Sequence, residues 1–161
     1  MELFEIIWVL IAAAMPIGEL RVAIPVAMIT YDFTWFQAAI FGLIGNLIPV
    51  FFMPWFLHKI AWVLLKLPQP IPFILEWRVR SLKNSGNDRI SKYGRLGLIP
   101  FVAIPLPFTG AWTGILVAWI FDIHPKKAIP MLTIGVIISG IIVTTLMYLG
   151  ISLKLFLGDF N

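Results

Sequence analysis

Three long stretches without a single charged side chain constrain what this chain can fold into. They are Phe33–Leu57, Leu96–Phe121 and Ala128–Leu153, which are 25, 26 and 26 residues long. A helix needs about 20 apolar residues to cross the hydrocarbon core of a membrane. The whole chain is 60% hydrophobic and 12% charged, whereas a soluble domain is about half apolar and a quarter charged. These features predict an all-α integral membrane protein.

The first apolar region is interrupted by charges and helix breakers. The sequence AMPIGELRVAIP holds Glu19 and Arg21 between Pro16 and Pro25. The uncharged pieces before and after these charges have 13 and 10 residues. As helices they reach about 20 and 15 Å, which is less than the core of about 30 Å. Two structures satisfy this pattern: one helix with buried charges, or a re-entrant helical hairpin over residues 4–31.

A later apolar region is interrupted in the same way. The breakers in its middle are Pro100, Pro105, Pro107, Thr109 and Gly110. A second re-entrant hairpin is therefore expected over residues 93–122. Transmembrane helices are expected over residues 33–58 and 125–153. The basic linker, residues 66–92, is expected to carry an amphipathic helix that lies on the membrane surface.

The two halves of the chain are related by a shift of 90 residues. Their identity is low, but the shift aligns Gly45 with Gly135, and both halves have the order half-helix, break, half-helix, short turn, long helix. We expect repeat one over residues 3–65 and repeat two over residues 93–153. If each half crosses the membrane once, the second enters from the opposite face, which makes the repeat inverted.

The basic residues favour this topology. In the hairpin arrangement ten of the twelve lysines and arginines lie on one side, and the exceptions are Arg21 and Lys154. The positive-inside rule makes that side cytoplasmic, with both termini outside and the chain in the cytoplasmic membrane. A plain four-span topology is the alternative, and it would place Lys126 and Lys127 on the side opposite to the linker.

Two segments resemble a known family. PIGELRVAIP (16–25) and YGRLGLIPFVAIPLPFTGAWTG (93–114) resemble the small multidrug export protein family, which is similar to the DedA/VTT superfamily of membrane proteins. The resemblance covers nearly the whole chain and departs from the pattern at Phe108, where glycine is expected. It implies two inverted re-entrant hairpins that face each other in the membrane, and a transport role. The superfamily has been linked to phospholipid scrambling and to recycling of polyprenyl-phosphate carriers, with proton coupling proposed.

Glu19 and Arg21 are the main candidates for substrate binding. A charge near the bilayer centre costs at least about 2.5–3.5 kcal/mol, and such residues are commonly functional. In the functional interpretation Arg21 binds an anion and Glu19 accepts a proton or acts as a counter-charge. In the structural alternative the two form an ion pair that only holds the hairpin tip. Helix N-termini at the tips would also attract an anion, which adds Thr109, Gly110 and Thr113 to the candidate substrate site.

Other candidates have simpler alternatives. Arg95 either receives a phosphate or extends to the membrane interface, and Asn46 either bonds across helices or lines the pathway. Asp32 and Asp122 are expected to cap the helices that follow them. The residues expected to shape the hairpin tips are Pro16, Pro25, Pro105, Pro107 and Gly114.

The sequence holds no cysteine and no hydrolytic, phosphate-loop or metal-ligand motif. We therefore expect no enzyme activity, no cofactor and no metal site, including at His58 and His124. The expected function is transport of a lipid-linked or small anionic substrate, of the phospholipid or polyprenyl phosphate class, with protons as the candidate coupling ion. Two alternatives are proton-coupled efflux of cationic drugs, which Arg21 disfavours, and a non-transporting membrane scaffold. The expected partners are membrane lipids and further copies of the chain, and nucleic acid is not expected.

Overall fold

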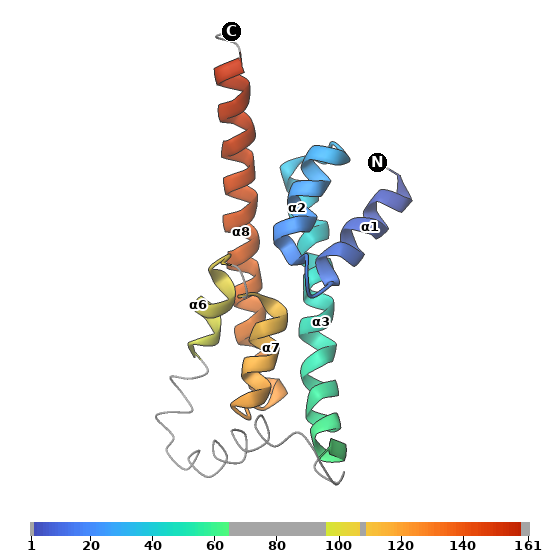
Figure 1. The fold of residues 1–161 in the computed structure, drawn as a ribbon, viewed down its shortest axis with the longest axis vertical. Coiled ribbons are helices and arrows are strands. Elements are labelled where there is room, and N and C mark those ends of the chain that lie inside the picture. Colours follow the sequence, from blue (N-terminus) through green and yellow to red (C-terminus); the bar gives the residue numbers. More distant parts are fainter. Residues whose placement is uncertain (1, 65–95, 107–108, 159–161) are drawn as a thin grey trace. The chain divides into compact units, whose positions relative to one another are not determined.

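The structure, a computed structural model, describes residues 2–64, 96–106 and 109–158. This part of the chain is helical and contains no strand, which confirms the expected all-α class. The helices are α1 (Leu3–Ala14), α2 (Glu19–Thr30), α3 (Trp35–Leu64), α6 (Leu98–Ala103), α7 (Ala111–Ile120) and α8 (Pro125–Gly158) (Figure 1). Three expectations lie outside the described residues: the surface helix of the linker 66–92, Arg95 and Pro107.

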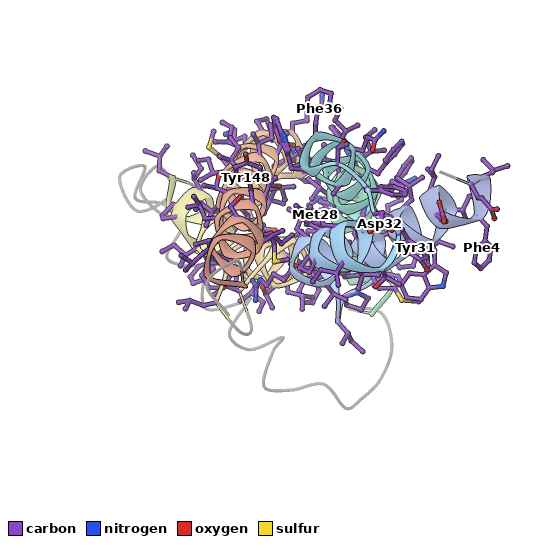
Figure 2. The ribbon with its side chains drawn as sticks, turned by 90° about the horizontal axis from the view of Figure 1, so that it is seen from above. Phe4, Met28, Tyr31, Asp32, Phe36 and Tyr148 are labelled. Carbon is purple, nitrogen blue, oxygen red and sulfur yellow. The ribbon has the colours of Figure 1, made fainter. Side chains whose placement is uncertain are left out.

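Among the described residues, two helices are long and apolar enough to cross a membrane, as expected. Their apolar parts are Trp35–Ile60 of α3 and Pro125–Leu153 of α8. Large apolar side chains are exposed along them, as the side chains of a helix in contact with lipid are. Phe52 is 73% exposed and Ile141 is 60% exposed. Figure 2 shows Phe36 pointing away from the helices around it, which fits its exposed fraction of 57%.

The chain divides into two compact units, and the long helices belong to both. Unit 1 is Met1–Leu47 with Val136–Asn161, and unit 2 is Ile48–Gly135. Unit 1 therefore holds α1, α2, the start of α3 and the end of α8. Unit 2 holds the end of α3, α6, α7 and the start of α8. Each unit combines one pair of short helices with part of each long helix.

The break between α1 and α2 follows from local backbone rules. A proline forces the residue before it into extended backbone, and Met15, which precedes Pro16, has a ψ of 147° and ends α1. Gly18 then passes so close to α1 that a Cβ added to it would lie 2.9 Å from the Ala12 carbonyl oxygen. Helix α2 begins at Glu19.

The break between α6 and α7 uses the same chemistry. Ile104 precedes Pro105 and is extended, with a ψ of 118°, which ends α6. Gly110 has a φ of 154° and a ψ of −168°, a combination that is essentially restricted to glycine. Helix α7 starts at the next residue, Ala111. Both interrupted regions are therefore two short helices around a break, as the prolines and glycines predicted.

The turns that lead into the long helices differ in one detail from expectation. Asp32 and Asp122 have left-handed φ values of 53° and 52° and lie three residues before α3 and α8, too early to cap them. The cap of α3 is Thr34, whose Oγ1 accepts the Gln37 N–H at 3.3 Å while the Gln37 Oε1 accepts the Thr34 N–H at 3.0 Å. His124 holds the matching position before α8. The prediction that a turn containing an aspartate precedes each long helix is confirmed, but the prediction that the aspartate caps the helix is wrong.

One packing contact recurs in both units with a spacing close to 90 residues. A Cβ on Gly45 of α3 would lie 2.5 Å from the Leu10 carbonyl oxygen of α1. A Cβ on Gly135 of α8 would lie 3.1 Å from the Ile99 carbonyl oxygen of α6 and 2.7 Å from the Val102 Cβ. In each unit a glycine on the long helix therefore lets the first short helix approach closely, in the way that small residues allow in membrane proteins.

Candidate functional site

The candidate site in unit 1 is built around the first turn of α2. Glu19 begins this helix, is 9% exposed and has a φ of 48°. A non-glycine residue in left-handed backbone costs of order 1–3 kcal/mol, and such residues concentrate at functional sites. Glu19 therefore combines a buried carboxylate with a strained backbone, inside a unit that is otherwise mostly apolar.

Leu20 fixes the position of this turn among the helices of unit 1. Its side chain is 1% exposed. A Cβ on Gly42 of α3 would lie 3.2 Å from one Leu20 methyl carbon, and a Cβ on Gly140 of α8 would lie 3.7 Å from the other. The start of α2 thus lies against both long helices of the unit. Glu19 and the partly buried Arg21 flank Leu20 in this place.

Asn46 lies one helical turn beyond Gly42 on α3 and is 2% exposed. Its side-chain Oδ1 has no hydrogen-bond partner within the part of the chain that the structure describes. An amide oxygen buried without a partner costs roughly 1–3 kcal/mol, and in a native protein it calls for an explanation. The interpretation that Asn46 bonds across helices finds no support at this oxygen, and the pathway interpretation stays a prediction.

Two further buried polar residues were not singled out from the sequence. Ser139 is 6% exposed and Thr144 is 7% exposed, both in the part of α8 that belongs to unit 1. The Thr144 Oγ1 has no hydrogen-bond partner among the described residues. The available signal was two pairs of small residues four positions apart on one apolar helix, Gly135 with Ser139 and Gly140 with Thr144, a spacing typical of a close helix contact.

The polar or charged residues that are buried in the described chain belong to unit 1. They are Glu19, Asn46, Ser139 and Thr144. In unit 2 the partly buried Thr133 has a buried Oγ1 with no hydrogen-bond partner among the described residues. Together with Arg21 the four buried residues of unit 1 provide a carboxylate, a guanidinium, an amide and two hydroxyl groups among apolar neighbours. Of these groups, a guanidinium is the one that binds phosphate and carboxylate with paired hydrogen bonds.

The other predicted binding residues lie in unit 2, and their hydroxyl groups bond locally. The Thr109 Oγ1 lies 2.7 Å from the Ile104 carbonyl oxygen and 2.8 Å from that of Leu106, as a donor, and it accepts the Leu106 N–H at 3.1 Å. The Thr113 Oγ1 donates to the Gly110 carbonyl oxygen at 3.2 Å. These bonds shape the break before α7, and a role of Thr109, Gly110 and Thr113 in binding stays a prediction.

The residues expected to shape the tips have different positions. Pro16 and Pro105 lie in the breaks themselves. Pro25 lies inside α2, which continues through it as membrane helices do when neighbouring groups compensate for the lost bond. Gly114 lies inside α7, where a Cβ would be 2.5 Å from a Val102 methyl carbon, so it serves the packing of α7 against α6.

The described residues offer no group of three or more His, Asp or Glu side chains that could hold a metal ion. His58 and His124 lie together, with ring centroids 5.6 Å apart.

The charged side chains described in unit 2 are mostly basic. The described basic side chains of unit 2 are Lys59, Lys126 and Lys127, and its described acidic side chain is Asp122.

The chain was compared with known families, curated proteins and solved structures. A family model described as "Putative small multi-drug export protein" matches residues 19–142. The comparisons with curated proteins and with solved structures gave no match. The family match starts at Glu19 and includes Arg21, Asn46, Ser139 and both long helices up to residue 142. Because this match covers more than half of the sequence, the chain belongs to this small multidrug export family of membrane proteins.

Proposed function

We propose that this protein is a transporter that moves an anionic or lipid-linked substrate, of the phospholipid or polyprenyl phosphate class, across the cytoplasmic membrane. The observation that carries the proposal is the buried, strained Glu19 beside Arg21 at the start of α2. A scaffold gains nothing from a charged and strained helix start within its apolar core. A transporter uses these groups to hold a charged substrate where water is excluded.

Arg21 decides which class of substrate we propose. Its guanidinium attracts an anion, and the N-terminus of α2 adds a partial positive charge of about half a unit. The oxygen atoms of Asn46, Ser139 and Thr144 complement the hydroxyl, glycerol or sugar groups of such a molecule. We propose protons as the coupling ion, with Glu19 as the group that exchanges them.

Efflux of a cationic drug is the second candidate, and one observation favours it. The Glu19 side chain and the Asn46 Oδ1 are both buried acceptors in unit 1, and such groups attract a cation. The family description also names drug export. Under this alternative Arg21 would be a counter-charge to Glu19 and would not contact the substrate.

Arg21→Gln separates these two functions. We expect the reconstituted wild-type protein to accelerate the movement of a fluorescent phosphatidylglycerol across a vesicle membrane, measured by dithionite reduction of the outer leaflet. Arg21→Gln should slow it at least tenfold, because a charge-assisted hydrogen bond in a dry site is lost. Lys83→Gln is the control, as a charge change in the linker. Ethidium movement by wild type without lipid movement would support drug efflux instead.

We further propose that the two halves form an inverted repeat of re-entrant hairpin and transmembrane helix, with the linker cytoplasmic and both termini outside. The equivalent glycine contacts at Gly45 and Gly135 support a repeat. The sequence places ten of twelve basic residues on one side in this topology. We also propose a homo-oligomer, because two crossing helices enclose little space on their own.

Single cysteines test this topology, since the wild type has none. A membrane-impermeant maleimide should label Ser85→Cys and Lys126→Cys only from the cytoplasmic side and Asn161→Cys only from the outside. The reason is the positive-inside rule. Labelling of Ser85→Cys and Lys126→Cys from opposite faces would show a four-span topology and rule out the hairpins.

A further inference from the structure

Unit 2 contains a second polar cluster that the proposed transport site does not use. It lies where the end of α3 meets the turn between α7 and α8. The Trp119 Nε1 donates to the Leu57 carbonyl oxygen at 2.9 Å and ties α7 to α3. The rings of His58 and His124 lie 5.6 Å apart, and those of Trp55 and His124 lie 5.8 Å apart.

This end of unit 2 combines a small pocket with exposed lysines. The pocket is lined by Pro54, His58, Ile115, Ala118, Trp119, Asp122, Ile123 and Pro125. The adjacent lysines, Lys59, Lys126 and Lys127, are all exposed. Three lysines against the single carboxylate of Asp122 leave the described part of unit 2 with a positive charge, all of it at this end of the unit.

A hydrogen bond to the His124 side chain indicates which of its ring nitrogens is the donor. Its Nδ1 accepts the Lys126 N–H at 3.2 Å. A neutral imidazole that accepts at one nitrogen carries its proton on the other, so the Nε2 of His124 is an N–H donor. The residue is exposed, and the exposed Lys126 and Lys127 follow it in the sequence.

We infer that this end of unit 2, defined by the pocket above and by Lys59, Lys126, Lys127 and the Nε2–H of His124, binds an anionic phospholipid. The phosphate fits the lysines and the His124 donor, and the acyl chains lie along exposed apolar side chains at this end, Phe56 (53% exposed) and Phe121 (49% exposed). Trp55, which is 40% exposed, is a side chain typical of the headgroup level of a membrane. The charge and the exposed aromatic side chains together favour a lipid over a soluble phosphate. This inference does not depend on the proposed transport function.

Native mass spectrometry of the full chain in detergent, with added phosphatidylglycerol, tests the site. Lys126→Gln should weaken phosphatidylglycerol binding about fivefold, and Lys126→Gln/Lys127→Gln about thirtyfold, because each lysine near an anionic lipid surface contributes about this much. Lys154→Gln, the matched removal of one lysine from unit 1, should change binding less than twofold. Phosphatidylcholine with the same acyl chains should bind more weakly and respond to none of these changes.

A second variant tests the histidine separately from folding. Asparagine is a good helix cap but is too short to present the Nε2 donor, so His124→Asn should keep the melting temperature and weaken phosphatidylglycerol binding severalfold. Equal losses in Lys126→Gln and Lys154→Gln would make the effect general electrostatics and overturn the site. Full competition by millimolar inorganic phosphate would also overturn the lipid assignment, because it would show a site for soluble phosphate.

Discussion

Glu19→Gln is expected to fold and to bind substrate, but to lose transport that depends on a pH gradient. The change keeps the size of the side chain and its hydrogen-bonding oxygen while removing the exchangeable proton. Burial among apolar side chains favours the neutral form of this carboxyl group. The positive charge of Arg21 favours its ionised form. A transport rate measured in vesicles across a range of imposed pH gradients will show whether this residue couples the two movements.

The same variant distinguishes coupling from a structural role. If Glu19 only balances Arg21, Glu19→Gln leaves a guanidinium without its counter-charge in an apolar unit, which is costly. The melting temperature should then fall, and Glu19→Gln/Arg21→Gln should restore it. Glu2→Gln is the matched control, because it makes the same change at an exposed position before α1. A stable Glu19→Gln protein with normal transport and an unchanged pH profile would contradict both roles.

Gly45→Ala is expected to destabilise the protein by about 2 kcal/mol, the middle of the range for overpacking a tight contact. The added Cβ would lie 2.5 Å from the Leu10 carbonyl oxygen and 2.8 Å from the Ala13 Cβ. Neither neighbour is the end of a flexible side chain, so α1 must move away from α3. Thermal unfolding in detergent, followed by circular dichroism, measures the effect.

Gly150→Ala is the control for this substitution and should have the opposite sign. Nothing lies within 4 Å of a Cβ at Gly150, so alanine there should stabilise α8 by about 0.5–1 kcal/mol through its helix propensity. Gly135→Ala should be destabilising like Gly45→Ala, because its Cβ would lie 2.7 Å from that of Val102. If Gly45→Ala and Gly150→Ala raised stability equally, the close contact between α1 and α3 would be refuted.

Local chemistry explains why much of the helical structure was predictable. Uncharged runs longer than 20 residues predict helices α3 and α8 whatever surrounds them. Pro16 and Pro105 force the residue before them into extended backbone, so the breaks after α1 and α6 follow from the nearest neighbours in the chain. The charged break at Glu19 and Arg21 was visible for the same reason, since charges are rare in such apolar sequence.

Capping and hydroxyl contacts were less predictable, because a small shift in the turn changes the partner. Asp32 suited a cap by residue type, but its left-handed φ of 53° places it three residues before α3, and Thr34 takes that role. Thr109 looked available for a ligand, whereas its Oγ1 bonds the carbonyl oxygens of its own loop. Both outcomes depend on backbone angles that composition does not specify.

Composition and local patterning were sufficient to predict the membrane environment, the two long helices and the position of both breaks. Tertiary structure decided which side chains are buried together. Helix α8 is apolar on every side, so its periodicity does not indicate which neighbour each face meets. Ser139 and Thr144 became part of the candidate site only because Gly140 lets α8 lie against Leu20 and Leu43. Such contacts join residues about a hundred positions apart, and packing between helices, not local sequence, selects them.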